Sequence, residues 1–159
     1  MIDLPARRGP RPSTTATNPH SQVDQQPTDA GIREALALRA FALRNVTEQP
    51  SGISVPGARA LCLDPALAAG SSGAFMVGTE FAHLHPSPDM SLHLMLPEVL
   101  ARRVTASGWG ELHIAARAGL IPSTAMMIYA PRDNEELEIA YELVVSSYRF
   151  ARGDFPASA

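Results

Sequence analysis

The sequence predicts an α+β fold, a single domain in which a mainly antiparallel β-sheet is covered by helices, with elements in the order α-β-β-β-β-α-β-α. Short segments of alternating apolar residues follow one another in the middle of the chain, and a Pro-rich turn joins two of them as in a hairpin. Segments with helical periodicity begin and end this region. The 159 residues suffice for one core, and they show neither an internal repeat nor a second domain.

The first part of the chain has the composition of a disordered tail. Residues 1–28 are rich in Pro, Ser, Thr, Gln and Arg and contain few large apolar side chains. Such a segment cannot bury enough surface to offset the entropy lost on ordering. We therefore expect residues 1–28 to be disordered and dispensable for stability, the folded domain to span 29–153, and residues 154–159 to fray.

The first helix is expected to begin at Thr28 or Asp29, either of which can cap it, and to end at Glu48-Gln49-Pro50-Ser51-Gly52. Its apolar face is formed by Ile32, Leu36, Ala40 and Leu43. A strand interrupted by Pro56-Gly57 is then expected over residues 53–63. A short apolar strand follows over residues 74–77.

Two strands, residues 80–85 and 91–96, should form a hairpin around the turn at residues 86–90. Because side chains alternate along a strand, the first strand places on one face Phe81, His83 and His85. The second places on one face Ser91, His93 and Met95. A symmetric hairpin sets His83 opposite His93, with Cβ atoms about 5 Å apart. The opposite, leucine-rich face suits a core covered by helices.

A helix is expected over residues 97–107, with Gly108 at its end. A loop follows, and then a fully buried strand over residues 124–130. Asp133 can cap the last helix, with Glu136 completing a capping box.

Composition excludes several classes of protein. The net charge is −3, so nothing draws the chain to nucleic acid or to an acidic membrane. All 13 basic residues are Arg, which leaves no Schiff-base or P-loop lysine. The single Cys62, between two leucines, indicates a buried inert thiol and suits a reducing cytoplasm. No apolar run is long enough to span a bilayer, no signal peptide is indicated, and we expect a cytoplasmic protein. The oligomeric state is left open.

The histidines are the candidate site. Four of the five, His83, His85, His93 and His113, lie between residues 80 and 132. One interpretation is a metal held by His83, His85 and His93, but no carboxylate is expected beside them because alternation turns Glu80 away. A second is that the imidazoles act as bases and hydrogen-bond donors toward an organic ligand. A third is that they are satisfied core or rim residues.

Two further residues, Trp109 and Arg132, have two interpretations each. Trp109, between two glycines, can wall a pocket above the histidines or simply fill the core. Tyr129 and Arg132 flank the end of a buried strand, where Arg132 can grip a substrate or pair with Glu135 or Glu136. With Phe81 and Met95, these residues make up the expected substrate-binding set.

Several motifs in the same order give a family resemblance. The segments Ala82-His83-Leu84-His85, Leu92-His93-Leu94, Gly108-Trp109-Gly110-Glu111-Leu112-His113 and Tyr129-Ala130-Pro131-Arg132 resemble those of the fungal luciferases. The chain looks still more like bacterial luciferase-domain proteins, which are distinct from the flavin-dependent luciferases. The resemblance covers about residues 74–152. The family usually has Arg-His-Pro where this chain has Leu112-His113-Ile114, and residues 1–28 lack the membrane anchor of the fungal enzymes.

The resemblance implies a small-molecule enzyme that needs no cofactor and no metal. Its substrate would be an oxygenated ring metabolite, such as a hydroxylated α-pyrone, with O2 as co-substrate. Histidine-assisted enolate formation would lead to oxygenation, isomerisation or cyclisation. The alternative is a non-catalytic module that binds a small ligand, or serves interaction, through the same pocket.

Overall fold

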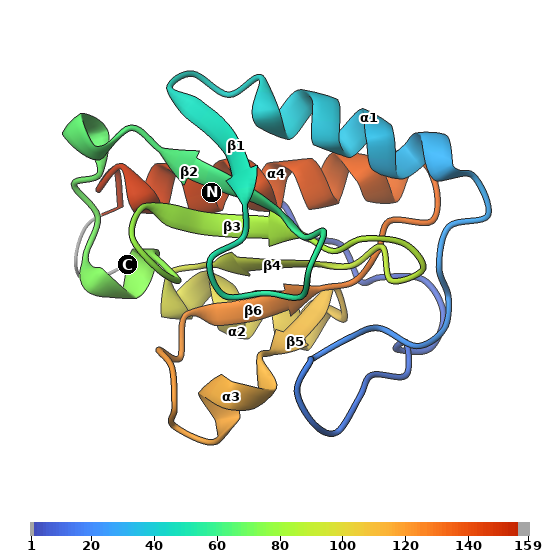
Figure 1. Ribbon diagram of the computed structural model, residues 1–159. Coiled ribbons are helices and arrows are strands. Elements are labelled where there is room, and N and C mark those ends of the chain that lie inside the picture. The colour runs from blue at the N-terminus through green and yellow to red at the C-terminus, as the bar shows by residue number, and fades with distance from the viewer. Residues whose placement is uncertain (1, 156–159) are drawn as a thin grey trace.

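The computed structural model describes residues 2–155 (Figure 1), and its centre is an antiparallel sheet with strand order β1-β2-β3-β4-β6-β5. The strands are β1 (Val46–Pro50), β2 (Arg59–Leu63), β3 (Glu80–Leu84), β4 (Leu92–Met95), β5 (Gly110–Leu112) and β6 (Ala125–Ile128). The helices are α1 (Ala30–Phe41), α2 (Glu98–Ser107), α3 (Ile114–Arg117) and α4 (Asn134–Ala151), with 3-10 turns η1 (Pro65–Leu67) and η2 (Ser72–Ala74). The predicted α+β class is confirmed.

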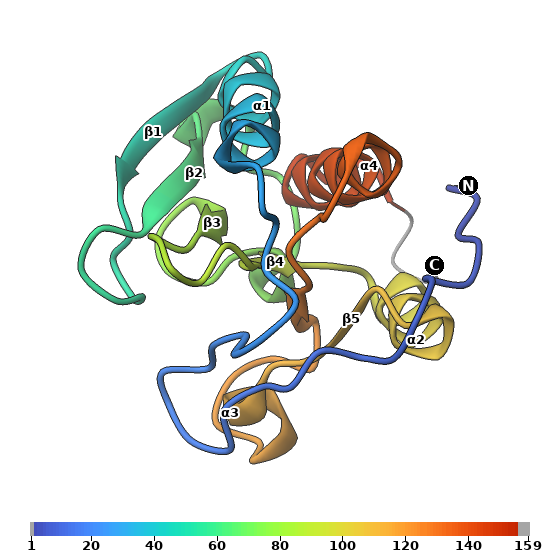
Figure 2. The same ribbon diagram turned by 90° about the vertical axis from the view of Figure 1, so that its right-hand side faces the viewer.

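One face of the sheet carries the hydrophobic core. Helix α4 contacts β3 and β4 and packs beside α1, and Figure 2 shows α1, α4 and α2 on the same side of the sheet. The leucines predicted for this face, Leu84, Leu92 and Leu94, are buried in the core with side chains from α1 and α4. Each such leucine contributes about 1.5–3 kcal/mol relative to an exposed one. This burial fixes which residues face the other side.

Helix ends follow the predicted signals. The Asp29 carboxylate accepts a hydrogen bond from the first turn of α1, and Asp133 accepts from the backbone N–H of Glu136 at 2.9 Å. Gly108 ends α2 at φ 80°, a left-handed conformation that favours glycine. The capping box is only half formed, because the Glu136 side chain pairs with Arg132 instead of returning to the cap.

Four local expectations were wrong. The strand expected over residues 53–63 begins only at Arg59, because residues 53–57 form bends and a turn. Residues 46–50 form β1 instead of ending the first helix, because they pair with β2. The sequence does not predict this polar edge strand, since it lacks alternating apolar residues. Residues 74–77 hold no strand beyond a single bridge from Val77 to Glu80. The loop expected after Gly108 contains β5 and α3.

The structure also corrects the expected disordered tail. Residues 2–28 pass α2, β5 and α3 as an extended segment (Figure 2), here called the N-terminal strap. The Arg7 N–H donates to Ser107 O at 2.9 Å, and the buried Gln22 accepts from the backbone N–H of Ala130 at 2.8 Å. The strap has no core of its own, but polar contacts with an existing surface hold it. Met1 and residues 156–159, most of the expected frayed end, lie outside the described residues.

Candidate functional site

The hairpin of β3 and β4 places three histidines together on the sheet face away from α1, α2 and α4. His83 pairs directly with His93, as the sequence predicts, and their ring centroids are 5.0 Å apart. The His85 ring lies 4.3 Å from His93 and 5.4 Å from His83. All three side chains are buried.

A β-bulge in β3 changes which side chains share this face. Leu61 of β2 pairs with Ala82 while the next residue, Cys62, pairs with Glu80, so Phe81 is the extra residue. Glu80 therefore points to the same side as His83, and its Oε1 lies 2.8 Å from His83 Nδ1. Phe81 turns into the core, fully buried, with its ring 6.2 Å from that of Tyr148. Its assignment to the substrate-binding set was wrong.

The Pro-rich turn supplies a second carboxylate. His85 follows the last residue of β3, and its backbone N–H donates to Ser91 O at 3.1 Å. Its Nδ1 lies 2.6 Å from Asp89 Oδ2 and 3.2 Å from the Ser91 hydroxyl. Both His83 and His85 therefore have a carboxylate partner at Nδ1.

His113 reaches the cluster from the start of α3. Its Nδ1 accepts a hydrogen bond from the Ala115 backbone N–H at 3.0 Å, which fixes the ring. The ring centroid is 4.6 Å from that of His93. The segment after Gly108 thus brings His113 to the site, whereas Trp109 lies in the core.

The fifth histidine, His20, was missed because it belongs to the N-terminal strap. Its Nε2 lies 2.8 Å from Glu111 Oε1, and its Nδ1 accepts from the Ile114 backbone N–H at 3.3 Å. The ring centroid is 5.0 Å from His113. A histidine among proline and polar residues carries no local signal of burial, so only the tertiary contacts could reveal it.

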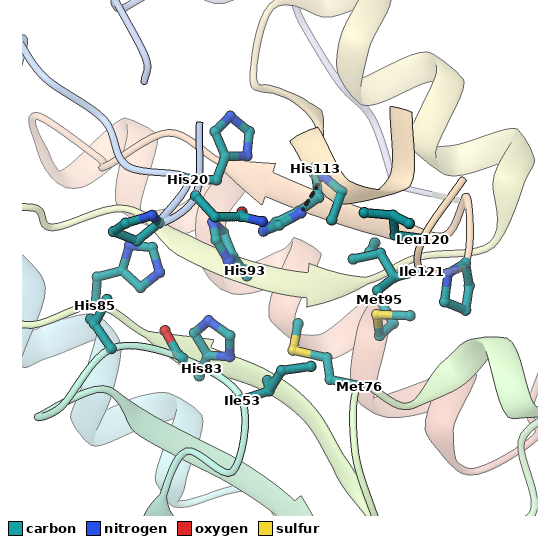
Figure 3. Close-up of a pocket in the computed structure, with 17 residues that line it drawn as sticks. His20, Ile53, Met76, His83, His85, His93, Met95, His113, Leu120 and Ile121 are labelled. Carbon is teal, nitrogen blue, oxygen red and sulfur yellow. Dashed lines mark hydrogen bonds between the residues drawn. The ribbon is translucent and has the colours of Figure 1, made fainter. Parts of the chain in front are cut away.

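These histidines line one pocket of about 610 Å³ (Figure 3). Apolar side chains line much of the rest, including Ile53, Met76, Met95, Leu120 and Ile121. Met95 thus lies where the sequence places it. A concave apolar space with a few convergent polar groups is the usual form of a small-molecule site.

Trp109, Tyr129 and Arg132 do not line this pocket. Trp109 packs in the core and donates from Nε1 to Pro5 O at 2.6 Å. The Tyr129 hydroxyl donates to Glu111 Oε2 at 2.9 Å, and the Arg132 guanidinium pairs with Glu136, 2.9 Å from Nε to Oε1. The core interpretation of Trp109 and the ion-pair interpretation of Arg132 describe the structure. Tyr129 is linked to the site only through Glu111, whose other oxygen binds His20.

Burial keeps the imidazoles of His20, His83, His93 and His113 neutral near pH 7. Desolvation lowers the pKa of His20 and His83 despite their carboxylate partners. It lowers the pKa of His93 well below its ordinary value and that of His113 to about 4. Burial alone would raise the pKa of Glu80, but hydrogen bonds from His83, Ser51 and Gly52 lower it overall. The Glu80–His83 pair is therefore a carboxylate with a neutral imidazole.

Hydrogen bonding then assigns the proton on each ring. A carboxylate only accepts, so the Nδ1 atoms of His83 and His85 carry their protons and each Nε2 offers a lone pair. His113 is the reverse, because its Nδ1 accepts and its Nε2 must carry the proton. Within residues 2–155, the buried Nε2 atoms of His83 and His93 have no hydrogen-bond partner.

Two groups of three histidines are close enough to hold a metal ion. They are His83, His85 and His93, and His20, His93 and His113, with one ring nitrogen from each residue within 4.8 Å of the others in its group. No helix within residues 2–155 is long and apolar enough to cross a membrane.

Fold and site together define a small α+β domain with a histidine-lined pocket. Residues 78–147 match the luciferase domain. The chain is 30% identical to a luciferase of Armillaria ostoyae over 97% of its length and 63% of that protein, and 30% identical to one of Armillaria mellea over the same shares. A luciferase of Neonothopanus nambi is 34% identical over 47% of the chain and 29% of that protein.

These matches support a fungal luciferase-like family for the chain. The relatives named here are fungal, whereas the sequence motifs pointed more closely to bacterial luciferase-domain proteins. The chain spans about 63% of the length of the Armillaria proteins it matches. No solved structure matches it significantly.

Proposed function

We propose that this protein is a small-molecule enzyme that acts on the enolate of an oxygenated ring metabolite of pyrone or polyketide type, as an oxygenase or as an isomerase or cyclase. One observation carries the proposal: the same pocket contains imidazole nitrogens that can accept a proton and an imidazole N–H that can donate a hydrogen bond. His83 and His85 present lone pairs on Nε2, whereas His113 presents an N–H. The luciferase names of the relatives support an enzyme of the luciferase family.

The proposed reaction begins with loss of the enol proton. The Nε2 lone pair of His83 or His85 accepts this proton. The His113 Nε2–H donates a hydrogen bond to the oxygen on which negative charge develops. In the oxygenase form, O2 adds across the electron-rich ring as an endoperoxide, which opens with loss of CO2. One O2 is consumed and one CO2 is released per turnover, with no external reductant. In the isomerase form, the proton returns to another ring atom.

Turnover of a panel of hydroxylated α-pyrones tests the proposal. We expect at least one ring to give O2 uptake with matching CO2 release, or a rearranged product by mass spectrometry. His113→Ala should lower kcat/KM by about 10²-fold or more, because it removes the donor to the enolate oxygen. Val99→Ala is the matched control, since that side chain is 43% exposed on α2, away from the pocket.

Binding of these rings without any product, in a protein that is correctly folded, would contradict the proposal. That result would favour the non-catalytic binding module instead.

A further inference from the structure

We propose that His83, His85 and His93 form a binding site for a divalent transition-metal ion, with Glu80 and Asp89 orienting two of the three ligands. The inference deepens the proposed function and rests on it for the pocket. It names what holds the negative charge of the bound enolate. Its test needs no substrate.

The ligands are close to the required arrangement. One ring nitrogen from each of the three histidines lies within 4.8 Å of the others, and all three side chains are buried. A tetrahedral ion with bonds of 2.0–2.1 Å needs nitrogens about 3.4 Å apart, a contraction that small ring rotations supply. The direct pairing of His83 with His93 fixes two of the ligands on adjacent strands.

The carboxylates behind the rings are the second observation. A histidine that binds metal usually donates its other ring N–H to a carboxylate or carbonyl, which fixes the tautomer and makes the ligand atom more basic. Glu80 accepts from His83 Nδ1 at 2.8 Å, and Asp89 accepts from His85 Nδ1 at 2.6 Å. Both bonds leave Nε2 free to bind a cation. The two negative charges also offset the charge of a divalent ion held by neutral ligands.

The third observation is that two ligand atoms lack a partner. The Nε2 atoms of His83 and His93 are fully buried, with no hydrogen bond from any residue in 2–155. A buried polar atom without a partner costs about 1–3 kcal/mol. The two atoms belong to directly paired residues, and a single bound cation would satisfy both.

Hydrogen bonding argues against the other group of three histidines. His20 uses both ring nitrogens, one toward Glu111 and one toward the Ile114 backbone N–H. The Nδ1 of His113 accepts from the Ala115 backbone N–H, so its Nε2 carries a proton and has no lone pair to offer. Metal binding by that group would break bonds already made, whereas the first group loses none.

The ligand set limits the metal and its role. Imidazole ligands without thiolate suit Zn²⁺, Fe²⁺, Co²⁺ or Ni²⁺ better than Mg²⁺ or Ca²⁺. Three protein ligands leave a coordination position open, and here it would face the pocket. With an ion bound, the Nε2 lone pairs of His83 and His85 would serve as ligands and no longer as the base. The ion would take over their role by lowering the pKa of an enol oxygen bound to it, whose proton would pass to solvent. No metal was expected because Glu80 was placed on the opposite face and because the resembling family needs no cofactor. The β-bulge removes the first reason, and the expectation itself stays a prediction to be tested.

Metal titration of the full chain tests the inference. Protein stripped with a chelator is titrated with Zn²⁺ by calorimetry and with Co²⁺ by visible absorption, and we expect one ion per chain. His83→Ala and His93→Ala should each abolish stoichiometric binding. Glu80→Gln should weaken it about 10–100-fold, because the ligand loses its orienting carboxylate. His20→Ala should leave the metal affinity unchanged.

Each outcome of the titration either supports or overturns the metal site. Absence of stoichiometric binding to the wild-type chain overturns the inference, as does equal weakening by His20→Ala and His83→Ala. Near-UV circular dichroism checks the fold of each variant, and the milder His83→Gln, which keeps a side chain of similar reach, should also lose the ion. Metal binding without turnover would contradict the proposed function alone. Full turnover by the stripped protein would contradict the role given to the metal.

Discussion

At the scale of single residues, Glu80 and Phe81 show how the bulge decides function. In a regular strand Phe81 would share the face of His83, and Glu80 would point into the helix-covered core. The extra residue reverses both assignments, so the carboxylate supports an imidazole and the phenyl ring joins Tyr148 in the core. The carboxylate thus lies beside a hydrogen-bond donor, and the phenyl ring lies among apolar side chains.

Replacing Phe81 tests its place in the core. Phe81→Ala should lower the free energy of unfolding by about 3–5 kcal/mol, because it removes a fully buried ring and leaves a cavity. Urea unfolding measures the loss. Met95→Ala is the comparison on the pocket side, where we expect weaker ligand binding. A small effect of Phe81→Ala on stability, together with a large one on binding, would return Phe81 to the pocket.

The buried Glu136 predicts how stability responds to acid. Burial alone would raise its pKa, but hydrogen bonds from Arg132 and the charge of Arg7 lower it overall. A carboxyl with a lowered folded-state pKa stabilises the protein above its unfolded value of about 4.3, and this contribution is lost as the pH falls through the folded pKa.

Glu136→Gln should therefore destabilise the protein at pH 7 by about 1–3 kcal/mol. The gap between wild type and variant should stay level above about pH 5 and shrink below about pH 4. Urea unfolding at a series of pH values measures it. A gap that does not change with pH would contradict the ion-pair interpretation.

At the scale of elements, β5 is positioned by the contact between two backbones. Gly110 pairs with Ile128, and a Cβ on Gly110 would overlap Met127 O and lie 3.0 Å from the Ile128 side chain. Strand β5 leads directly into His113 and α3, so this close approach sets where that imidazole enters the pocket.

Gly110→Ala should cost about 1–3 kcal/mol or more, because the methyl group has no space and backbone must shift. Gly119→Ala is the control. Gly119 has φ +72°, but a Cβ there meets nothing within 4 Å, so only the cost of a left-handed conformation, about 1 kcal/mol, is expected. Thermal and urea unfolding compare the two variants. Equal losses would show that the close approach of β5 to β6 is unimportant.

At the scale of the whole molecule, the N-terminal strap completes the pocket. It supplies His20, and its contacts run to α2, β5 and the end of β6 through Arg7, Thr14 and Gln22. These contacts are mostly hydrogen bonds, so a segment with little apolar surface is held without a core of its own.

Substitutions at Gln22 and at its neighbour Val23 test whether the hydrogen bonds of the strap contribute to the stability of the protein. Gln22→Ala should cost about 1–3 kcal/mol, because the buried Ala130 N–H loses its acceptor. Val23→Ala should cost less than about 0.5 kcal/mol, because that side chain is 62% exposed. Urea unfolding gives both values. If Gln22→Ala were as mild as its neighbour, residues 1–28 would be dispensable after all.

Local signals predicted much of this structure. Alternation and a Pro-rich turn gave the hairpin that pairs His83 with His93, and capping chemistry located α1 and α4. Glycine after the apolar run located the end of α2. These features depend on residues close together in the chain, which is why sequence patterns carry them.

The missing parts depend on distant partners. The bulge beside Glu80 is visible only in the pairing with β2, and β1 is a strand only because β2 lies next to it. His20 reaches the pocket through Glu111 and α3, about ninety residues away in the chain. The placement of Trp109 in the core likewise follows from the strap, which supplies Pro5 O to its indole.

The strap is synthesised early but takes its folded position late. It is synthesised before the rest of this domain, yet the Ala130 partner of Gln22 is 108 residues further along the chain and the Glu111 partner of His20 is 91 residues further. Closing such long loops is slow and comes after local structure in folding. During translation the imidazoles of the hairpin therefore stay open to solvent on one side until residue 130 has emerged. The pocket is complete only after the strands and helices that hold the strap have all been synthesised.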